Sequence, residues 1–268
     1  MNKTKLGIKS LRKVELQSSC VYGPVQSRRL GQSLGINPLP AGIKVCSFDC
    51  LYCQYGFEKP VGGRESVSSD IFPTVSTVLD QLESRVNRFQ GSIDAITFSG
   101  NGEPTLHPDF LGLVRGTVKI RDHYLPKSRV VLLSNGTTVR DEEIQEAIKL
   151  IDDPIVKLDA GDKDLWFAIN RPERGIDLDD IVSVMAVIDH IIVQSLFFKG
   201  DGDGVEGNIS GDSIDSWLSV IEEIQPRYVQ IYTLDRTPAM NGIKPAPKVI
   251  LRGIQSSLEK MGIGGCIF

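Results

Sequence analysis

The sequence predicts an α/β protein folded as a partial (β/α)6 TIM-like barrel, because short apolar runs alternate with longer amphipathic stretches. The short runs contain many β-branched residues and are bounded by turn-forming residues, as strands are. The longer stretches carry apolar residues at helical spacing. Strands that alternate with helices form parallel sheets with right-handed crossovers. Six such units are too few to close an eight-unit barrel, so we expect the sheet to stay open.

Six strands and the helical regions between them can be placed along the chain. The apolar runs predict strands at 33–37, 94–99, 129–134, 154–159, 190–195 and 228–232. Helical spacing predicts helices around 75–89, 110–114, 141–151, 213–221 and 250–261, and a helical region from the fourth strand to about residue 187. Ser213 is the expected cap of the helix at 213–221, and Gly262 is the expected stop of the last helix.

Composition and charge indicate an ordinary globular protein. Of the 268 residues, 41% are hydrophobic and 24% are charged. We expect an N-terminal extension at 1–32 and a core domain at 33–268. The basic residues at 3–13 are not followed by an apolar segment, and no apolar run is long enough to span a membrane. The sequence therefore predicts a cytoplasmic protein with no membrane partner. A net charge of −4 gives no global case for nucleic-acid binding.

Three cysteines at C-x3-C-x2-C spacing, Cys46, Cys50 and Cys53, form the most specific motif of the chain. Thiolates are the usual ligands of iron–sulfur clusters, and three of them leave one iron of a [4Fe–4S] cube open to a substrate or cofactor. A structural zinc site would need a fourth ligand, and none lies nearby in sequence. Disulfides are disfavoured inside cells. Of the remaining cysteines, Cys20 has no assigned role. Cys266 could be a catalytic thiol, but we expect it to be a buried free cysteine, as free cysteines usually are.

The cysteine spacing resembles the signature of the radical S-adenosylmethionine (radical SAM) superfamily, whose core is a partial barrel of this kind. The resemblance implies that SAM chelates the open iron and is cleaved to a 5′-deoxyadenosyl radical, and that Tyr52 lies beside the adenine. Four segments extend the resemblance to a compact subgroup related to the wyosine-type tRNA-modifying radical SAM proteins. They are 23–56, 99–107, 156–160 and 229–236.

Polar residues at the strand ends are candidate SAM contacts, because ligands bind beyond the carboxyl ends of parallel strands. The segment around Gly102 and Glu103 resembles the family's G-G-E-P segment, which implies that it contacts the SAM amino group. Asn135 resembles a "TNG"-like strand end near the methionine moiety. Ordinary turns would also explain both segments. His107 follows as a possible proton donor, although a lone loop histidine is more often structural.

The fourth and fifth strands add three further candidates. Lys157 and Asp159 point to the same face of their strand by period two. They resemble positions of the superfamily that bind the SAM carboxylate and the ribose. A structural ion pair inside the barrel is the alternative. Gln194, at the end of the fifth strand, is a further candidate for cofactor binding.

A second group of polar residues could contact the substrate. The guanidinium groups of Arg28 and Arg29 suit a carboxylate or phosphate, or else form surface ion pairs. Asp235, Arg236 and the loop at 199–208 lie on the rim where ligands bind. No catalytic residue is assigned.

The sequence therefore predicts a radical SAM enzyme, an oxidoreductase or a transferase, that needs a reductant such as flavodoxin or ferredoxin. The resemblance and the local basic residues favour RNA base modification, with tRNA as a partner. Two alternatives remain open, namely an activase that abstracts hydrogen from a glycine of a partner protein, and a non-catalytic iron–sulfur module.

Overall fold

A single curved sheet organises the molecule. The computed structural model describes residues 14–57, 68–200 and 207–268. The strands are β1 (Val21–Ser27), β2 (Gly31–Ile36), β3 (Ala95–Phe98), β4 (Arg129–Ser134), β5 (Asp153–Lys157), β6 (Ile192–Lys199), β7 (Tyr228–Thr233), β8 (Lys244–Pro245) and β9 (Gly265–Ile267). They follow the order β1-β2-β3-β4-β5-β6-β7-β9, and β8 pairs with β6.

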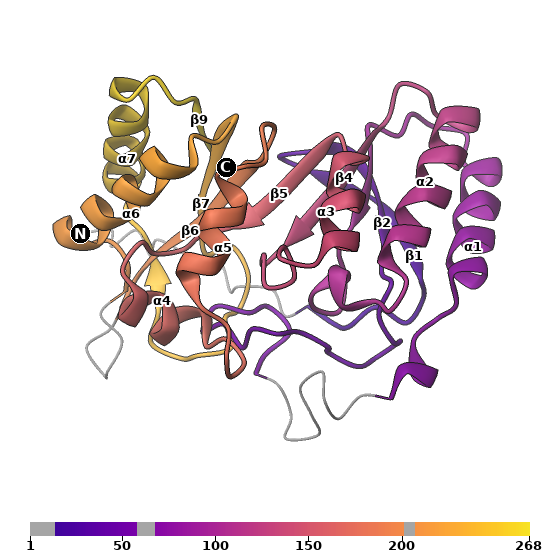
Figure 1. Cartoon of the computed structure of the whole chain (residues 1–268), viewed down its shortest axis with the longest axis horizontal. Helices are drawn as coiled ribbons and strands as arrows, with labels where there is room; N and C mark the ends of the chain where they lie inside the picture. The colour runs from indigo at the N-terminus through magenta and orange to yellow at the C-terminus, as the bar shows by residue number, and fades with distance from the viewer. Residues whose placement is uncertain (1–13, 58–67, 201–206) are drawn as a thin grey trace, which may run out of the picture.

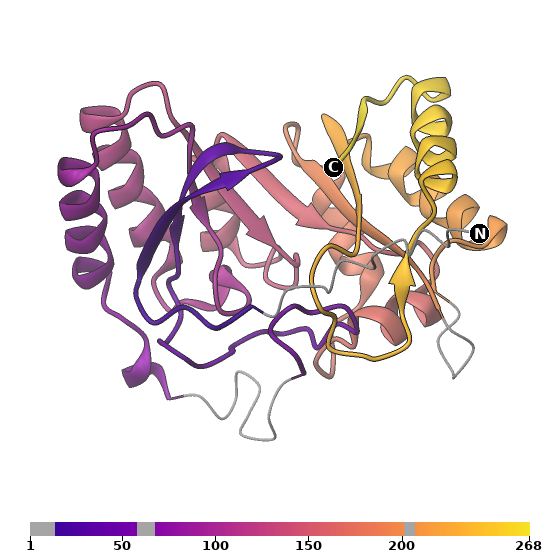
Figure 2. The ribbon, with the colours of Figure 1, turned by 180° about the vertical axis from the view of Figure 1, so that it is seen from behind.

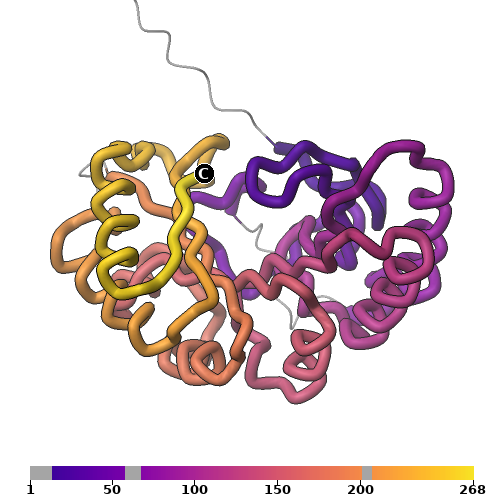
Figure 3. The backbone as a smooth tube through the Cα atoms, turned by 90° about the horizontal axis from the view of Figure 1, so that it is seen from above, coloured from indigo at the N-terminus to yellow at the C-terminus, as the bar shows by residue number. Residues whose placement is uncertain are grey.

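The sheet is parallel from β2 through β7 and on to β9, with antiparallel strands only at β1 and β8 among the described residues. Seen from above, the chain curls into an open arc whose two ends are formed by its first and last described strands (Figure 3). This is the partial barrel that the alternation of strands and helices predicts.

The helices form an outer layer around the arc (Figure 1). They are α1 (Val75–Arg88), α2 (Phe110–Tyr124), α3 (Glu142–Lys149), α4 (Lys163–Asn170), α5 (Leu178–Met185), α6 (Gly211–Ile224) and α7 (Lys248–Lys260), with 3-10 turns η2 (Ser69–Ile71) and η3 (Pro104–Leu106). Seen from behind, the β1–β2 hairpin forms one edge of the curved sheet (Figure 2). Apolar side chains of helices and strands merge into one large buried core between the two layers. Among the described residues, no helix is both long and apolar enough to cross a membrane.

The inside of the barrel has an apolar floor. Leu30, from the turn between β1 and β2, packs with Ala95, Val131, Ile155 and Ile192 from four successive strands of the sheet. All five side chains are at most 5% exposed.

The six predicted strands correspond to β2–β7, and the structure adds three that were not predicted. The segment with Gly23 and Pro24, two residue types that are typical of turns, forms β1, an edge strand in which proline is tolerated. The helical region before residue 187 is two helices, because Arg171 ends α4 in a left-handed conformation. The cap of α6 is Ser210, whose side chain accepts from the Ser213 N–H, so Ser213 was wrongly predicted as the cap.

Two further predictions concern the end of the last helix and the boundary between the N-terminal extension and the core domain. Gly262 lies just past α7 with a φ of 76°, as predicted for a C-terminal stop. The expected boundary between residues 32 and 33 stays a prediction; in the structure β2 runs across it and pairs with β1.

Candidate functional site

The segment at 45–53, which carries the three cysteines and is called the cysteine segment below, lies against the rim at the carboxyl ends of the strands. Backbone hydrogen bonds hold it on two sides. On one side Val45 pairs with the loop after β3, donating from its N–H to Asn101 O at 2.9 Å and accepting from Glu103 N–H at 3.0 Å. On the other side the N–H of Leu51 donates to Ile169 O of α4 at 3.0 Å. The segment therefore crosses the mouth of the barrel and is fixed at both ends.

Gly102 is required for this docking. Its φ is 147°, and a Cβ at this position would lie 1.8 Å from Val45 O. Any side chain would push the cysteine segment away from β3. The glycine therefore allows two backbone segments to approach each other closely, in addition to any approach of a ligand.

None of the three thiols of the motif is in a disulfide; Cys50 is buried, whereas Cys46 and Cys53 are partly exposed. Burial and the neighbouring Cys50 raise the pKa of Cys46 well above its usual value, and burial raises the pKa of Cys50 to about 11. Protons therefore stay on Cys46 and Cys50 until a metal displaces them. In the described part of the chain no set of His, Cys, Asp or Glu side chains converges as ligands of a single ion. A four-iron cube contacts each cysteine through a different iron, so its sulfurs need not converge.

Two buried asparagines contact these sulfurs. Asn135 Nδ2 lies 3.7 Å from Cys46 Sγ and 2.9 Å from Ser47 Oγ. Asn170 Nδ2 lies 3.4 Å from Cys50 Sγ. Hydrogen bonds from amide groups to cysteine sulfurs help to set the reduction potential of iron–sulfur clusters. The two asparagine amides therefore fit a cluster bound at this place.

Glu103 is fully buried at the end of β3, and its carboxylate organises the neighbouring strand end. Its Oε1 accepts from Thr105 Oγ1 at 2.6 Å and from Ser134 Oγ at 2.9 Å, and its Oε2 accepts from Asn135 N–H at 2.6 Å. Burial raises the pKa of Glu103, although these hydrogen bonds favour the ionised form. The carboxylate thus holds Asn135 in place below the cysteine segment.

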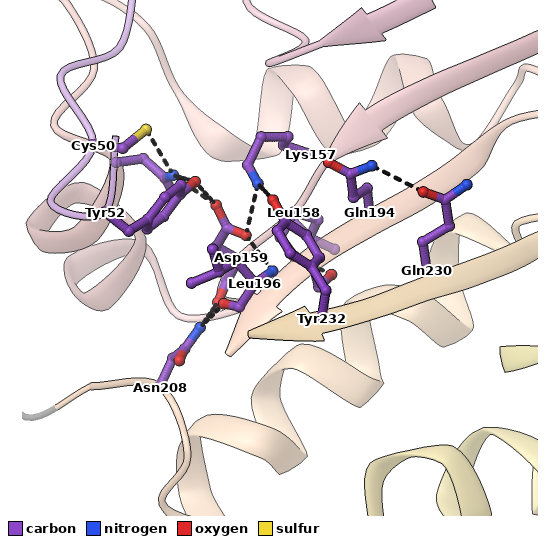
Figure 4. Close-up of polar contacts among 12 residues, drawn as sticks. Cys50, Tyr52, Lys157, Leu158, Asp159, Gln194, Leu196, Asn208, Gln230 and Tyr232 are labelled. Atoms are coloured by element: carbon purple, nitrogen blue, oxygen red, sulfur yellow. Dashed lines mark hydrogen bonds and ion pairs between the residues drawn. The ribbon is translucent and has the colours of Figure 1, made fainter. Parts of the chain in front are cut away.

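Asp159 lies at the centre of a polar network that Figure 4 shows. Its Oδ1 accepts from Leu196 N–H at 2.8 Å and pairs with Lys157 Nζ at 3.3 Å. Its Oδ2 accepts from the Tyr52 hydroxyl and from Asn170 Nδ2, the latter at 2.8 Å. The Asp159 side chain has no exposed surface, so the network fixes the groups around it rather than presenting the carboxylate.

Lys157 lies between two tyrosines. Its Nζ donates to Tyr232 Oη at 2.6 Å and lies 4.9 Å from the centre of the Tyr52 ring (Figure 4). Burial alone would lower the pKa of Lys157, but Asp159 and Tyr232 outweigh it and raise the pKa. Burial, followed by Asp159, raises the pKa of Tyr52. Lys157 therefore stays a cation and Tyr52 stays a neutral hydrogen-bond donor.

Gln194 extends the polar lining into β7. Its Nε2 donates to Gln230 Oε1 at 2.9 Å (Figure 4). Gln230 Nε2 in turn donates to Tyr228 Oη at 2.9 Å. Asn208 holds the end of β6 through bonds of 2.7 Å to the carbonyls of Asp159 and Leu196.

A cleft of about 510 Å³ collects the predicted site residues. This volume is within the range of small-molecule sites. Nine of the ten predicted residues line it, and the tenth, Asp159, lies behind Tyr52 and Lys157. The nine are Cys46, Cys50, Tyr52, Cys53, Gly102, Glu103, Asn135, Lys157 and Gln194. Their roles toward a cofactor stay predictions.

The candidates outside this set have different outcomes. Arg28, Arg29, Asp235 and Arg236 also line the cleft. His107 does not, and both its ring nitrogens bond to the backbone. Cys266 is exposed on β9 rather than buried, and it does not line the cleft. Residues 201–206 of the predicted rim loop and the basic residues at 3–13 lie outside the described residues.

Sequence analysis missed two residues that hold the site together, Tyr232 and Asn170. Tyr232 could have been found, because it lies at the end of a predicted strand. Asn170 ends α4, and no motif marks it. Asn208 is the last residue of the loop at 199–208, which was predicted to lie on the rim.

The chain belongs to the radical SAM superfamily, whose sequence model matches residues 42–192, more than half of the chain. It is also similar to curated proteins. It is 32% identical over 238 residues to a UPF0026 protein of Methanocaldococcus jannaschii, covering 85% of this chain and 67% of that protein. It is 30% identical over 240 residues to a protein named GTPase Obg from Brachyspira hyodysenteriae, covering 88% of this chain but only 32% of that protein.

Solved structures share the fold. A radical SAM methyltransferase from Sphaerobacter thermophilus superposes with a TM-score of 0.62 at 14% identity, covering 88% of this chain and 65% of that chain. A structure of TYW1 with a lysine-pyruvate adduct superposes with a TM-score of 0.56 at 13% identity, covering 85% and 73%. Membership makes the chain a radical SAM enzyme, and it implies a [4Fe–4S] cluster, SAM and a source of electrons.

Proposed function

We propose that Cys46, Cys50 and Cys53 hold the [4Fe–4S] cluster and leave one iron for SAM. The observation that carries this is the joint placement of the three thiols and the strand-end polar residues in one cleft. When bound and reduced, the cluster supplies the electron that cleaves the SAM sulfonium to methionine and a 5′-deoxyadenosyl radical. The protein supplies placement and excludes water and oxygen.

The lining residues suit the parts of SAM. Glu103 offers a carboxylate to the ammonium group, and the backbone at Gly102 and Asn135 lies next to it. Lys157 offers a positive charge to the SAM carboxylate, and Tyr52 offers a ring face to the adenine. Gln194 offers an amide to the nucleoside.

Asp159 was predicted to bind the ribose, and this stays a prediction. Its fully covered carboxylate supports a positioning role, in which it fixes Lys157 and Tyr52.

The reaction is tested by reconstituting the chain with iron and sulfide and adding reductant and SAM. We expect 5′-deoxyadenosine from the wild type, with flavodoxin or ferredoxin as the electron donor, and none from Cys50→Ala. A Cys50→Ala variant that forms 5′-deoxyadenosine at the wild-type rate would refute the ligand assignment. Because such clusters survive best under reducing conditions, we place the protein in the cytoplasm.

For the substrate we propose RNA base modification, with tRNA as the partner. The sequence resemblance and the basic residues at 3–13 support it. Phosphate contacts release counterions, so binding of tRNA should weaken steeply with salt. Absence of any tRNA binding at low salt would count against RNA. A glycyl-radical EPR signal on a co-purified protein would instead indicate an activase.

A further inference from the structure

A part of the cleft not assigned to the cofactors lies where the β1–β2 turn meets the end of β7. Arg28 Nη2 pairs with Asp235 Oδ2 at 3.1 Å. The guanidinium carbon of Arg29 lies 5.0 Å from the centre of the Tyr232 ring. Both arginines, Tyr232 and Asp235 line the cleft. The β1–β2 turn therefore reaches across the open side of the barrel. It places Arg29 next to the Tyr232 ring, which Lys157 also contacts.

Arg29 differs from its neighbours because its charge is not balanced. Its Nη1 is buried and has no hydrogen-bond partner. Within residues 14–57, 68–200 and 207–268 no carboxylate forms an ion pair with it, whereas Lys157 pairs with Asp159 and Arg28 with Asp235. A buried donor without a partner destabilises the folded protein, and more so when it is charged. A ligand that accepts from this nitrogen would remove that destabilisation.

Tyr232 fixes the guanidinium without neutralising it. The ring lies 5.0 Å from both the Arg29 guanidinium carbon and Lys157 Nζ, at cation–π distance. Arg236 adds an exposed cation to the lining, and it has no ion pair among the described residues. The local excess of positive charge favours an anion.

We propose that Arg29 binds an oxyanion of the substrate, a phosphate or a carboxylate, at the meeting point of the β1–β2 turn and β7. This inference rests on the proposed function, because it makes the same cleft the substrate site. The planar guanidinium offers paired N–H donors that match either group. The substrate would then be an anionic molecule held by its oxyanion while its reacting part faces the cofactors.

The test measures binding without turnover, on the reconstituted protein loaded with SAM. Inorganic phosphate and succinate are titrated separately by calorimetry, so that the two sources of the oxyanion are distinguished. We expect one of them to bind with a dissociation constant of about 1 mM. Arg29→Gln should weaken this binding about tenfold, and Arg29→Lys should weaken it less because the charge remains. The control Arg115→Gln, which changes an exposed arginine of α2 that pairs with Glu146 and does not line the cleft, should bind the anion as the wild type does.

Three results would overturn the proposal. They are no saturable binding of either anion, equal weakening by Arg115→Gln, and a loss of SAM affinity in Arg29→Gln, which would assign Arg29 to the SAM carboxylate. The melting temperature of each variant shows that it is folded. Failure of the wild type to form 5′-deoxyadenosine would instead refute the proposed function, and the anion titration does not depend on that reaction.

Discussion

Asn170 joins three groups, two from the cysteine segment and one that follows β5. Its Nδ2 lies within hydrogen-bonding distance of Cys50 Sγ, Tyr52 Oη and Asp159 Oδ2. An amide nitrogen has two hydrogens, so it satisfies at most two of these acceptors at once. Its Oδ1 is buried without a partner. An amide whose oxygen has no partner and whose nitrogen is shared by three acceptors contributes little to folding stability. We therefore infer that Asn170 acts on the Cys50 sulfur.

Asn170→Leu should make the reduction potential of the cluster more negative. A hydrogen bond to a ligand sulfur stabilises the reduced, more negative cluster. A bond worth about 1 kcal/mol corresponds to roughly 40 mV for one electron. An EPR-monitored redox titration of the reconstituted protein measures the shift. The control is Asn208→Leu, which removes another buried asparagine that contacts Asp159 O but no sulfur. An equal shift in both variants would contradict the assignment.

Glu103 should make folding stability depend on pH. Burial raises its pKa above the usual 4.5, so the folded chain binds this proton more tightly than the unfolded chain. The contribution is present at low pH and is lost as pH rises from 4.5 through the folded pKa. Relative to Glu103→Gln, the wild-type free energy of unfolding should therefore fall over that range. Urea unfolding of both iron-free chains at several pH values measures this difference in the free energy of unfolding. A difference that stays constant or rises with pH would disprove the effect.

The cysteine segment and the loop after β3 behave as one element, because their backbones touch at Gly102. In Gly102→Ala the new Cβ would meet Val45 O at 1.8 Å. We expect the segment to be displaced and iron incorporation to be largely lost, in addition to about 1–3 kcal/mol of backbone strain. Gly175→Ala is the control, since Gly175 has a φ of 89° but no atom within 4 Å of a Cβ. Iron per chain after reconstitution is the measurement, and normal loading in Gly102→Ala would exclude this role.

The elements show which parts of the fold local sequence determines. The buried strands β2–β7 are apolar runs, so they could be predicted. β1 could not, because Gly23 and Pro24 resemble a turn and only pairing with β2 makes the segment a strand. β9 has the same origin, since its pairing with β7 is a contact between distant residues.

At the scale of the whole molecule, the candidate site was predictable where a motif or a strand end marked it. The cysteine spacing and the strand-end rule led to residues that the fold brings into one cleft. The supporting groups were not predictable, because their meaning depends on tertiary distance. Asn170 lies 120 residues from Cys50 in sequence, and only the docking of α4 against the cysteine segment brings the two together.

The two rims of the barrel have different roles: ion pairs at the amino ends of the strands stabilise the fold, and the cleft at the carboxyl ends holds the candidate site. At the amino ends of the strands, the Asp153 carboxylate bonds to both Arg129 and Arg227 and links β4, β5 and β7. Its side chain is 5% exposed, whereas those of the arginines are 45% and 44% exposed. Asp153→Asn removes the charge that both arginines share. Because the arginines are half-exposed to water, we expect a loss of about 1–3 kcal/mol rather than the full cost of a buried charge.

The cleft lies at the other rim, so 5′-deoxyadenosine formation per iron-loaded chain should not change in Asp153→Asn at temperatures where the variant is folded. Urea unfolding gives the stability and the SAM cleavage assay gives the activity. A variant of unchanged stability would show that water already screens the pair. A folded, iron-loaded variant with impaired cleavage would show that the two rims are coupled through β5, which carries Asp153 at its start and Lys157 at its end.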